Sequence, residues 1–195
     1  KSIGYEEDFL NYLKDLKFTG NIKSMQEGEI CFGNEPLLRV EAPLIQAQLI
    51  ETILLNIINF QTLIATKASR IRQIATHDTL MEFGTRRAQE IDAALWGARA
   101  AFIGGFDSTS NVRAGKLFNI PVSGTHAHAL VQTYGDEYIA FKKYAERHKN
   151  CVFLVDTFHT LKSGVPTAIK VAKELGDTIN FIGIRLDSGD IAYLS

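Results

Sequence analysis

Two histidines separated by one residue, His126 and His128, are the side chains of this sequence best suited to chemistry. They belong to a Gly-Thr-His-Ala-His run at 124–128, which follows a short apolar segment at 119–122 and precedes a polar helical pattern. Because imidazole changes its charge near neutral pH, a histidine can transfer a proton, bind a metal ion or accept a phosphoryl group as a nucleophile. These residues by themselves leave all three roles open.

An H-x-H pair at the end of a strand is typical of metal-dependent hydrolases, and Asp156 or His159 would be the further ligands here. The preceding strand is short and interrupted, and two of the other histidines, His77 and His148, fall in predicted helices. A clear set of further histidine ligands is therefore missing. The competing interpretation is one structural histidine and one histidine that faces solvent.

Two further clusters contain groups that bind anions or flat ligands. Phe83 offers a ring that can stack on a planar ligand, and Arg86 and Arg87 can bind a carboxylate or a phosphate. Solvated arginines in a first helical turn explain this cluster equally well. The Asp-Ser-Thr-Ser-Asn run at 107–111 would present backbone N–H groups to an anion, but helix capping is its expected role.

Two clusters with carboxylates lie toward the C-terminal end of the sequence. The strand-like segment 152–155 ends at Asp156, in a pattern that loosely resembles the phosphoribosyl pyrophosphate signature of orotate-type transferases but has one acid instead of two. An Asp that caps the next helix is the competing interpretation. Arg185, Asp187 and Asp190 place a cation and two carboxylates within one turn. Such a group suits a divalent cation or ribose hydroxyls beside an anionic substrate.

The secondary-structure elements that position these clusters start with a small N-terminal region of one helix and short strands. Apolar spacing predicts a helix over 5–16, and glycine punctuation predicts a β-rich region with its best strands at 28–32 and 37–40. Pro43 then opens a long helical pattern that reaches about His77.

From residue 80 onward the sequence repeats an apolar strand, a polar loop and a helix. This alternation predicts a parallel sheet, and a series of such units predicts an α/β barrel or part of one. The fold class is therefore α/β. Residues 1–42 are assigned to a mixed, β-rich domain, and residues 43–195 to the long helix and the first part of the barrel. The strand-like segments are 80–83, 101–105, 120–122, 151–155 and 181–184.

The composition limits the partners and the location. The chain has 195 residues, of which 46% are hydrophobic, a net charge of -1 and no basic block, so neither nucleic acid nor an anionic membrane is favoured as a partner. Cys31 and Cys151 lie far apart, which favours a reducing intracellular compartment. Polar residues interrupt the apolar stretch 44–64, so no membrane span is predicted. The chain begins without Met or a signal peptide, and we expect it to be an internal piece of a longer protein.

The ordered set of clusters is similar to the nicotinate phosphoribosyltransferase family. The matching runs are 83–87, 108–111, 124–128, 155–157 and 185–190. The resemblance implies a type II phosphoribosyltransferase fold, an irregular α/β barrel (here incomplete) beside a mixed α/β domain. It implies cytoplasmic, ATP-coupled transfer of phosphoribosyl from phosphoribosyl pyrophosphate to nicotinate, which yields nicotinate mononucleotide and pyrophosphate for NAD biosynthesis. Mg2+ is the implied cofactor, ATP a co-substrate, and the implied assembly is a homodimer with active sites at the subunit interface.

The resemblance also assigns roles to residues. Its implied catalytic residues are His128, which ATP would phosphorylate, Asp156, which would hold the imidazole in one tautomer, and Asp187, near the ribose or the metal-bound pyrophosphate. No residue is assigned as a metal ligand of the protein's own. The implied substrate-binding residues are Phe83, Arg86, Ser110, Asn111, Thr125, Arg185, Ser188 and Gly189.

Four of these substrate-binding residues receive particular roles from the resemblance. Phe83 would stack on the pyridine ring, and Arg86 would lie close to the anionic groups. Thr125 and Arg185 would lie near the nicotinate carboxylate.

Substrate choice depends on a neutral loop. Related nicotinamide enzymes place an acid where this chain has Ser110 or Asn111, and an acid would repel a carboxylate, so the neutral residues favour nicotinate. Asp107, nearby in the sequence, leaves that preference open. Two other functions also stay open: a metal-dependent hydrolase built on His126 and His128, and a non-catalytic barrel that binds a nucleotide as a sensor.

Overall fold

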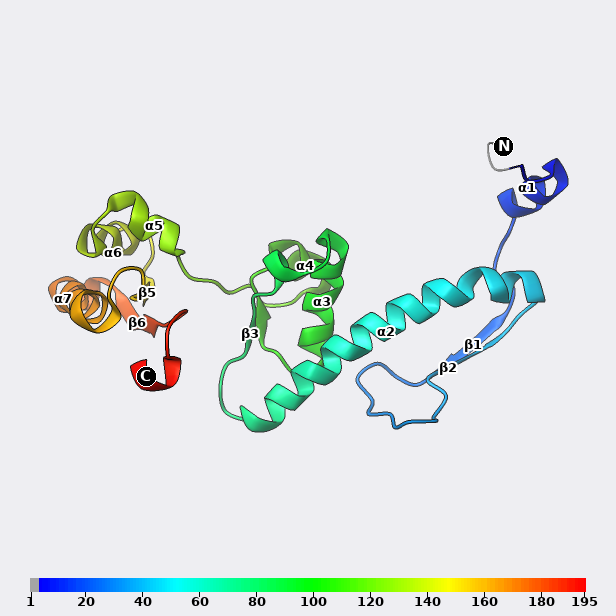
Figure 1. The fold of residues 1–195 in the computed structure, drawn as a ribbon, viewed down its shortest axis with the longest axis horizontal. Coiled ribbons are helices and arrows are strands. Elements are labelled where there is room, and N and C mark those ends of the chain that lie inside the picture. Colours follow the sequence, from blue (N-terminus) through cyan, green and yellow to red (C-terminus); the bar gives the residue numbers. More distant parts are fainter. Residues whose placement is uncertain (1–3) are drawn as a thin grey trace. The chain divides into compact units, whose positions relative to one another are not determined.

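The computed structural model describes residues 4–195, which form two compact units. The first unit ends at Ser123, and the second is Gly124–Ser195 (Figure 1). Each unit combines helices with short paired strands, so the predicted α/β class is confirmed.

The first unit begins with a helix and an antiparallel strand pair. The helix predicted within 5–16 is α1 (Glu7–Lys14). Its first turn has acidic residues and its last turn has a lysine, and these charges interact favourably with the helix dipole and stabilise the helix. β1 (Asn21–Ser24) pairs antiparallel with β2 (Leu38–Glu41). The strand predicted at 37–40 is therefore confirmed, and its partner is an earlier segment than predicted.

The strand predicted at 28–32 is wrong, because this segment is a loop between β1 and β2. Carboxylates within the loop satisfy its backbone amides. Glu29 accepts a hydrogen bond from the N–H of Gln26 at 3.0 Å, and Glu35 accepts one from the N–H of Phe32 at 2.8 Å. These local side-chain hydrogen bonds take the place of the inter-strand backbone hydrogen bonds that the apolar residues predicted.

The long helix predicted from Pro43 is α2 (Leu44–Ile74), and Pro43 is its N-cap residue. It packs against α3 (Ile91–Ile103), so closely that a Cβ at Gly104 would lie 2.6 Å from Ala68 Cβ. Within residues 4–195, α2 is the one helix whose length and composition would allow it to cross a membrane. That it does not do so stays a prediction.

The strand predicted at 101–105 is wrong, because α3 continues to Ile103. Its alanines at 98, 100 and 101 are buried, so this apolar run is buried by helix packing and not within a sheet. The helix ends at Gly104 and Gly105, and Gly105 has a φ of 103°, which suits glycine.

The strand that follows α3 is β4 (Ser108–Thr109), which pairs in parallel with β3 (Met81–Glu82). η1 (Thr85–Arg87), a 3-10 turn, follows β3, and α4 (Val112–Phe118) follows β4. Val122 adds one parallel bridge to Thr109. The residues after β3 and β4 therefore lie at the carboxyl end of one short parallel pair, and β4 falls in a segment predicted to be a loop.

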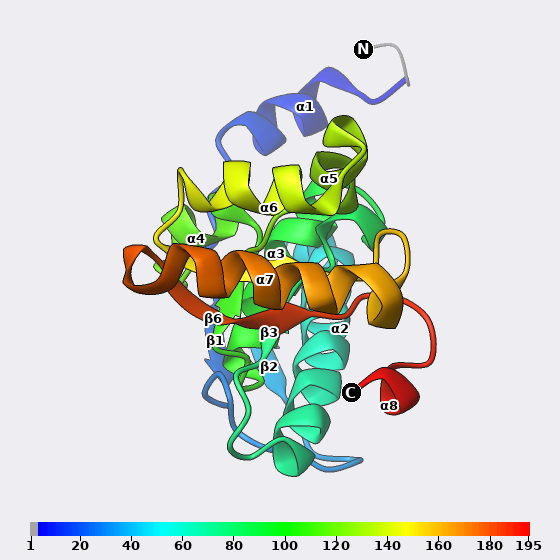
Figure 2. The same ribbon diagram turned by 90° about the vertical axis from the view of Figure 1, so that its left-hand side faces the viewer.

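The second unit is a parallel strand pair covered by helices. β5 (Asn150–Leu154) pairs with β6 (Asn180–Arg185). α6 (Glu137–Ala145) and α7 (Val165–Leu175) lie side by side against this pair (Figure 2). The core between them contains the fully buried side chains of Val131, Phe141, Phe153, Val155 and Val171.

Short segments connect these elements. α5 (His128–Tyr134) precedes α6, and η2 (Thr160–Gly164), a π-helical turn, leads into α7. η3 (Gly176–Thr178) precedes β6, and α8 (Ile191–Leu194) follows it. The loops after β5 and β6 carry the polar residues of the second unit.

Candidate functional site

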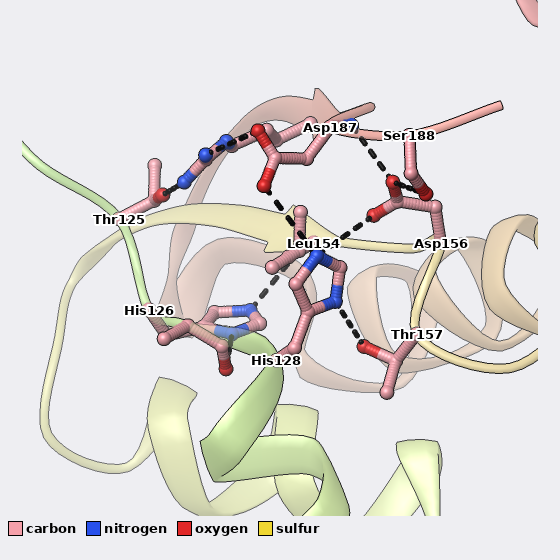
Figure 3. A network of polar contacts seen from close by, with 10 residues as sticks. Thr125, His126, His128, Leu154, Asp156, Thr157, Asp187 and Ser188 are labelled. Atoms are coloured by element: carbon pink, nitrogen blue, oxygen red, sulfur yellow. Dashed lines mark hydrogen bonds and ion pairs between the residues drawn. The ribbon is translucent and has the colours of Figure 1, made fainter. Parts of the chain in front are cut away.

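His128 is the centre of a polar network in the second unit. It is the first residue of α5, and its side chain is about one third exposed. Its Nδ1 lies 3.0 Å from the Thr157 hydroxyl, and its Nε2 lies 3.5 Å from Asp187 Oδ2 and 3.9 Å from Asp156 Oδ1 (Figure 3). Carboxylates favour an N–H at the nitrogen that faces them, so this arrangement favours hydrogen on Nε2 and a lone pair on Nδ1.

Asp156 joins the end of β5 to the loop after β6. Its carboxyl group is almost fully buried, and its Oδ2 accepts hydrogen bonds from the N–H of Asp187 at 2.8 Å and the hydroxyl of Ser188 at 2.7 Å. Its Oδ1 is buried and, among residues 4–195, has no hydrogen-bond partner. Asp156 thus lies beside the imidazole, although Asp187 is the nearer carboxylate.

Arg185 links the same loop to the histidine segment. Its Nη1 donates to the Thr125 hydroxyl at 2.6 Å, and its Nη2 donates to Asp187 Oδ1 at 2.7 Å. The hydrogen bond from this guanidinium is the main reason why the pKa of Asp187 lies below its usual value. Asp187 is therefore a carboxylate at neutral pH, between a cation and the imidazole.

His126 has a different role from His128. Its buried ring accepts the N–H of Leu154 on Nε2 at 3.1 Å and lies edge-on to Tyr144, with a centroid distance of 4.8 Å. Burial is the main cause that lowers the pKa of His126, so the ring stays neutral. His126 is therefore the structural histidine of the pair, and it fastens the 124–128 segment to β5.

This geometry removes the basis for a metal site on the histidine pair. The Nε2 lone pair of His126 is taken by the Leu154 amide, so it is not free to bind a metal. His159 accepts the N–H of Lys162 on Nδ1 at 3.3 Å, which caps η2. Within residues 4–195, no group of three or more His, Cys, Asp or Glu side chains could hold a metal ion.

The first unit carries the other predicted residues at the ends of β3 and β4. Phe83 and Arg86 follow β3 and are exposed to solvent. Ser110 follows β4, and its N–H donates to the carbonyl of Glu82 at 2.9 Å. Asn111 is the N-cap of α4, where its side chain accepts the N–H of Ala114 at 3.0 Å, so capping in the 107–111 run is confirmed.

Asp107 is engaged by two partners within the first unit. Its Oδ2 accepts the N–H of Leu80 at 2.7 Å and a hydrogen bond from Arg72 at 2.5 Å. The Leu80 amide, followed by the Arg72 guanidinium, lowers the pKa of Asp107. Its carboxylate ties the end of α2 to the start of β3. Arg72 is 35 residues away in sequence, so no local pattern could reveal this pairing.

Sequence reasoning gave no individual role to Thr157 and missed Glu82. Thr157 supplies the hydroxyl at His128 Nδ1, and its position directly after Asp156 at a strand end was the available signal. Glu82 accepts a hydrogen bond from Thr109 at 2.6 Å. Its contact crosses between two strands, and no pattern within either strand indicates it.

The parallel pair β5–β6 carries carboxylates and a guanidinium at its carboxyl end, beside a histidine at the start of α5. This arrangement places the chain among α/β proteins with polar groups suited to anionic ligands. A model of the nicotinate phosphoribosyltransferase (NAPRTase) N-terminal domain matches residues 1–59, and a model of the nicotinate phosphoribosyltransferase (NAPRTase) family matches residues 79–194. The chain therefore belongs to the nicotinate phosphoribosyltransferase family, which confirms the resemblance seen in its ordered motifs.

Individual relatives agree with this assignment. Over 193 residues the chain is 72% identical to nicotinate phosphoribosyltransferase from Bacillus subtilis, a match that covers 99% of the chain and 39% of the relative. The crystal structure of human nicotinic acid phosphoribosyltransferase has a TM-score of 0.85 and 31% identity, over 96% of this chain and 47% of that one. The crystal structure of nicotinate-nucleotide pyrophosphorylase from Pyrococcus furiosus has a TM-score of 0.78 and 32% identity, over 88% of this chain and 43% of that one. The chain thus spans less than half the length of these relatives.

Proposed function

We propose that the complete protein transfers phosphoribosyl from phosphoribosyl pyrophosphate to nicotinate, coupled to ATP hydrolysis. The products are nicotinate mononucleotide and pyrophosphate, in NAD biosynthesis. The observation that carries the proposal is the surroundings of His128, with a hydroxyl at one ring nitrogen and two carboxylates at the other. Membership of the nicotinate phosphoribosyltransferase family supports the choice of substrates.

In the proposed ATP step, the Thr157 hydroxyl rotates away from His128 Nδ1, and the freed Nδ1 lone pair attacks the γ-phosphorus of ATP. An N–P bond forms while the bond from phosphorus to the leaving oxygen of ADP breaks. Asp187 and Asp156, 3.5 Å and 3.9 Å from Nε2, hold the proton there and stabilise the positive charge that builds on the ring. The phosphoryl group adds roughly two negative charges. This charge changes the affinity for substrates, and water later releases the group as phosphate.

In the proposed transfer step, the ring nitrogen of nicotinate attacks the anomeric carbon as pyrophosphate leaves. Positive charge develops on the ribose, and the carboxylate of Asp187 stabilises it. Arg185 and Thr125, joined at 2.6 Å, bind the nicotinate carboxylate. Ser188 and Gly189 bind substrate from the same loop as Asp187.

In the first unit, four residues at the strand ends take the proposed pyridine-binding roles. The exposed ring of Phe83 stacks on the pyridine, and Arg86 binds an anionic group. Ser110 and Asn111 supply neutral loop groups that tolerate a carboxylate. The engagement of Asp107 by Arg72 supports a preference for nicotinate over nicotinamide.

The donors of Asp156 and Asp187 fit the implied Mg2+. This ion takes one or two carboxylates and completes its shell with phosphates and water. Asp156 Oδ1 is a buried carboxylate oxygen that lacks a hydrogen-bond partner among residues 4–195. Bound there, Mg2+ would neutralise charge on the pyrophosphate.

Other proposals concern the complete protein. We propose that the parallel pairs β3–β4 and β5–β6 are parts of the irregular barrel of type II phosphoribosyltransferases, here incomplete. A division into residues 1–42 and 43–195, a homodimer with shared active sites and a cytoplasmic location also stay predictions.

The test substitutes His128 by Asn in the complete gene product. With phosphoribosyl pyrophosphate, Mg2+ and nicotinate present, we expect His128→Asn to lose ATP hydrolysis and the stimulation of mononucleotide formation by ATP, because the nucleophile is gone. His77→Asn is the matched control, since His77 is exposed in the first unit. Retention of both activities in His128→Asn would remove the phosphohistidine role.

Replacing nicotinate with nicotinamide in the same assay tests substrate choice. Product from nicotinamide alone would overturn the proposed role of the neutral loop. Nucleotide binding without turnover of either substrate by the unsubstituted protein would favour a sensor.

A further inference from the structure

The two loops proposed to bind the pyridine ring diverge just where their backbone ladder ends. β3 and β4 share only two register pairs, Met81↔Ser108 and Glu82↔Thr109. One more backbone bond, from the N–H of Ser110 to the carbonyl of Glu82, follows at 2.9 Å. Beyond it the chain runs into η1 on one side and α4 on the other, so backbone pairing does not hold these loops together.

The side chain of Glu82 continues the connection. Its Oε2 accepts the hydroxyl of Thr109 at 2.6 Å, and its Oε1 accepts the backbone N–H of Gly84. The Thr109 hydroxyl in turn accepts the N–H of Asn111 at 3.0 Å. One carboxylate therefore connects the backbone of the Phe83 loop to the backbone of the Ser110 loop.

The surroundings make this connection stiff. Thr109 is fully buried, so bulk water cannot replace Glu82 as the hydrogen-bond partner of its hydroxyl. Breaking this bond would leave a buried polar group unsatisfied, which destabilises the fold. Gly84 gives the carboxylate its space, because a Cβ there would lie 2.7 Å from Glu82 Oε1. The carboxylate acceptor makes the bonds from the Thr109 hydroxyl and the Gly84 N–H stronger than bonds to a neutral acceptor would be.

We propose that Glu82 is a positioning residue for nicotinate, acting through Thr109 and Gly84 to set the spacing of the loops that carry Phe83 and Ser110. The inference rests on the proposed function, in which Phe83 stacks on the pyridine ring. Glu82 itself does not touch the substrate. Loss of the link loosens the loops and weakens nicotinate binding, while the ATP step at His128 is unaffected.

The test replaces Thr109 by Val, which keeps the shape of the side chain and removes the hydroxyl. In the complete gene product, we expect Thr109→Val to raise the KM for nicotinate roughly 10-fold and to change kcat by less than about twofold. The KM for ATP stays unchanged. Thr109→Ser, which restores the hydroxyl, is expected to bring the KM for nicotinate back to within about twofold of the parent.

A matched control removes a hydrogen bond of the same type elsewhere. The Tyr138 hydroxyl donates to Glu174 at 2.6 Å, between α6 and α7 in the second unit. Tyr138→Phe therefore loses a hydroxyl–carboxylate bond of equal length, and we expect it to leave the KM for nicotinate unchanged. An equal rise in KM in Thr109→Val and Tyr138→Phe would mean that the effect is general loss of stability and would overturn the proposal.

Hydrogen–deuterium exchange tests the link without turnover. We expect Thr109→Val to speed amide exchange in 83–87 as well as in 109–112, because Glu82 joins the two segments. Faster exchange in 109–112 alone would overturn the proposal. If the unsubstituted protein forms no mononucleotide, the proposed function fails, and the exchange result alone then decides the role of Glu82.

Discussion

At the scale of single residues, the backbone gives two neighbouring histidines opposite environments. His126 precedes α5 and turns its ring into the core beside Tyr144, where the Leu154 amide binds Nε2. His128 begins α5 and faces the carboxylates of the loops after β5 and β6. One ring is therefore fixed as a neutral acceptor in the core, and the other lies partly exposed between a hydroxyl and two carboxylates.

The neutrality of His126 predicts a pH-dependent stability. Burial depresses its folded-state pKa, and the charges of Arg185 and His128 act in the same direction. The unfolded chain therefore binds a proton first, and stability falls as the pH drops through the ordinary histidine pKa of about 6.5 towards the folded value. We expect the midpoint of urea unfolding to be lower at pH 5.5 than at pH 7.5.

The variant His126→Gln isolates this contribution. A glutamine side-chain oxygen can accept the Leu154 N–H without titrating, so we expect the difference between the two midpoints to shrink. An undiminished difference would show that His126 does not cause the acid sensitivity.

At the scale of elements, close backbone contact fixes how α7 joins β5. The π-helical turn η2 ends at Gly164, where a Cβ would lie 1.8 Å from the carbonyl oxygen of Val155. Nothing larger than hydrogen fits between these two backbones. The contact holds the start of α7 against the end of β5, directly before Asp156 and Thr157.

Gly164→Ala is therefore expected to destabilise the second unit. The methyl group must push backbone away from backbone, which costs about 3 kcal/mol. Urea unfolding followed by circular dichroism measures the loss. Gly124→Ala is the control in the same unit, since a Cβ there would meet nothing within 4 Å. Equal stability of the two variants would contradict the close contact.

At the scale of the whole molecule, the long helix α2 exposes a large apolar surface. Leu55 and Leu63 are each more than 60% exposed. Such surface is normally covered by another protein surface or by lipid. The rest of the complete protein, a second subunit or lipid could cover this surface. We predict the second subunit, because the family resemblance implies a homodimer with a shared active site.

This prediction is checked by the mass of the complete gene product in solution. We expect a dimer, and we expect Leu63→Glu to weaken the dimer roughly 100-fold, because an unpaired carboxylate would be buried at the contact. Gln48→Glu adds the same charge at an exposed polar position of α2 and should leave the mass unchanged. A dimer that tolerates Leu63→Glu would place the interface elsewhere, and binding of the protein to liposomes would favour lipid as the cover.

The sequence by itself determined the features that depend on local periodicity and residue chemistry. Helical spacing gave α1 and α2, apolar runs gave β5 and β6, and the order of polar clusters gave the family. Two strand predictions were wrong for local reasons: the carboxylates of Glu29 and Glu35 satisfy amides in the 25–36 loop, and buried alanines extend α3 through 101–103. The strand predicted at 120–122 is reduced to a single bridge at Val122.

Only the tertiary structure decided which partner each polar side chain takes. His126 meets an amide 28 residues away, Arg72 meets Asp107 35 residues away, and Glu82 meets Thr109 27 residues away. Local spacing carries no information on such pairs, because each depends on how separate elements pack. The physical reason is that periodicity sets which face of an element is buried, whereas hydrogen-bond partners are set by the distance between elements after they have packed.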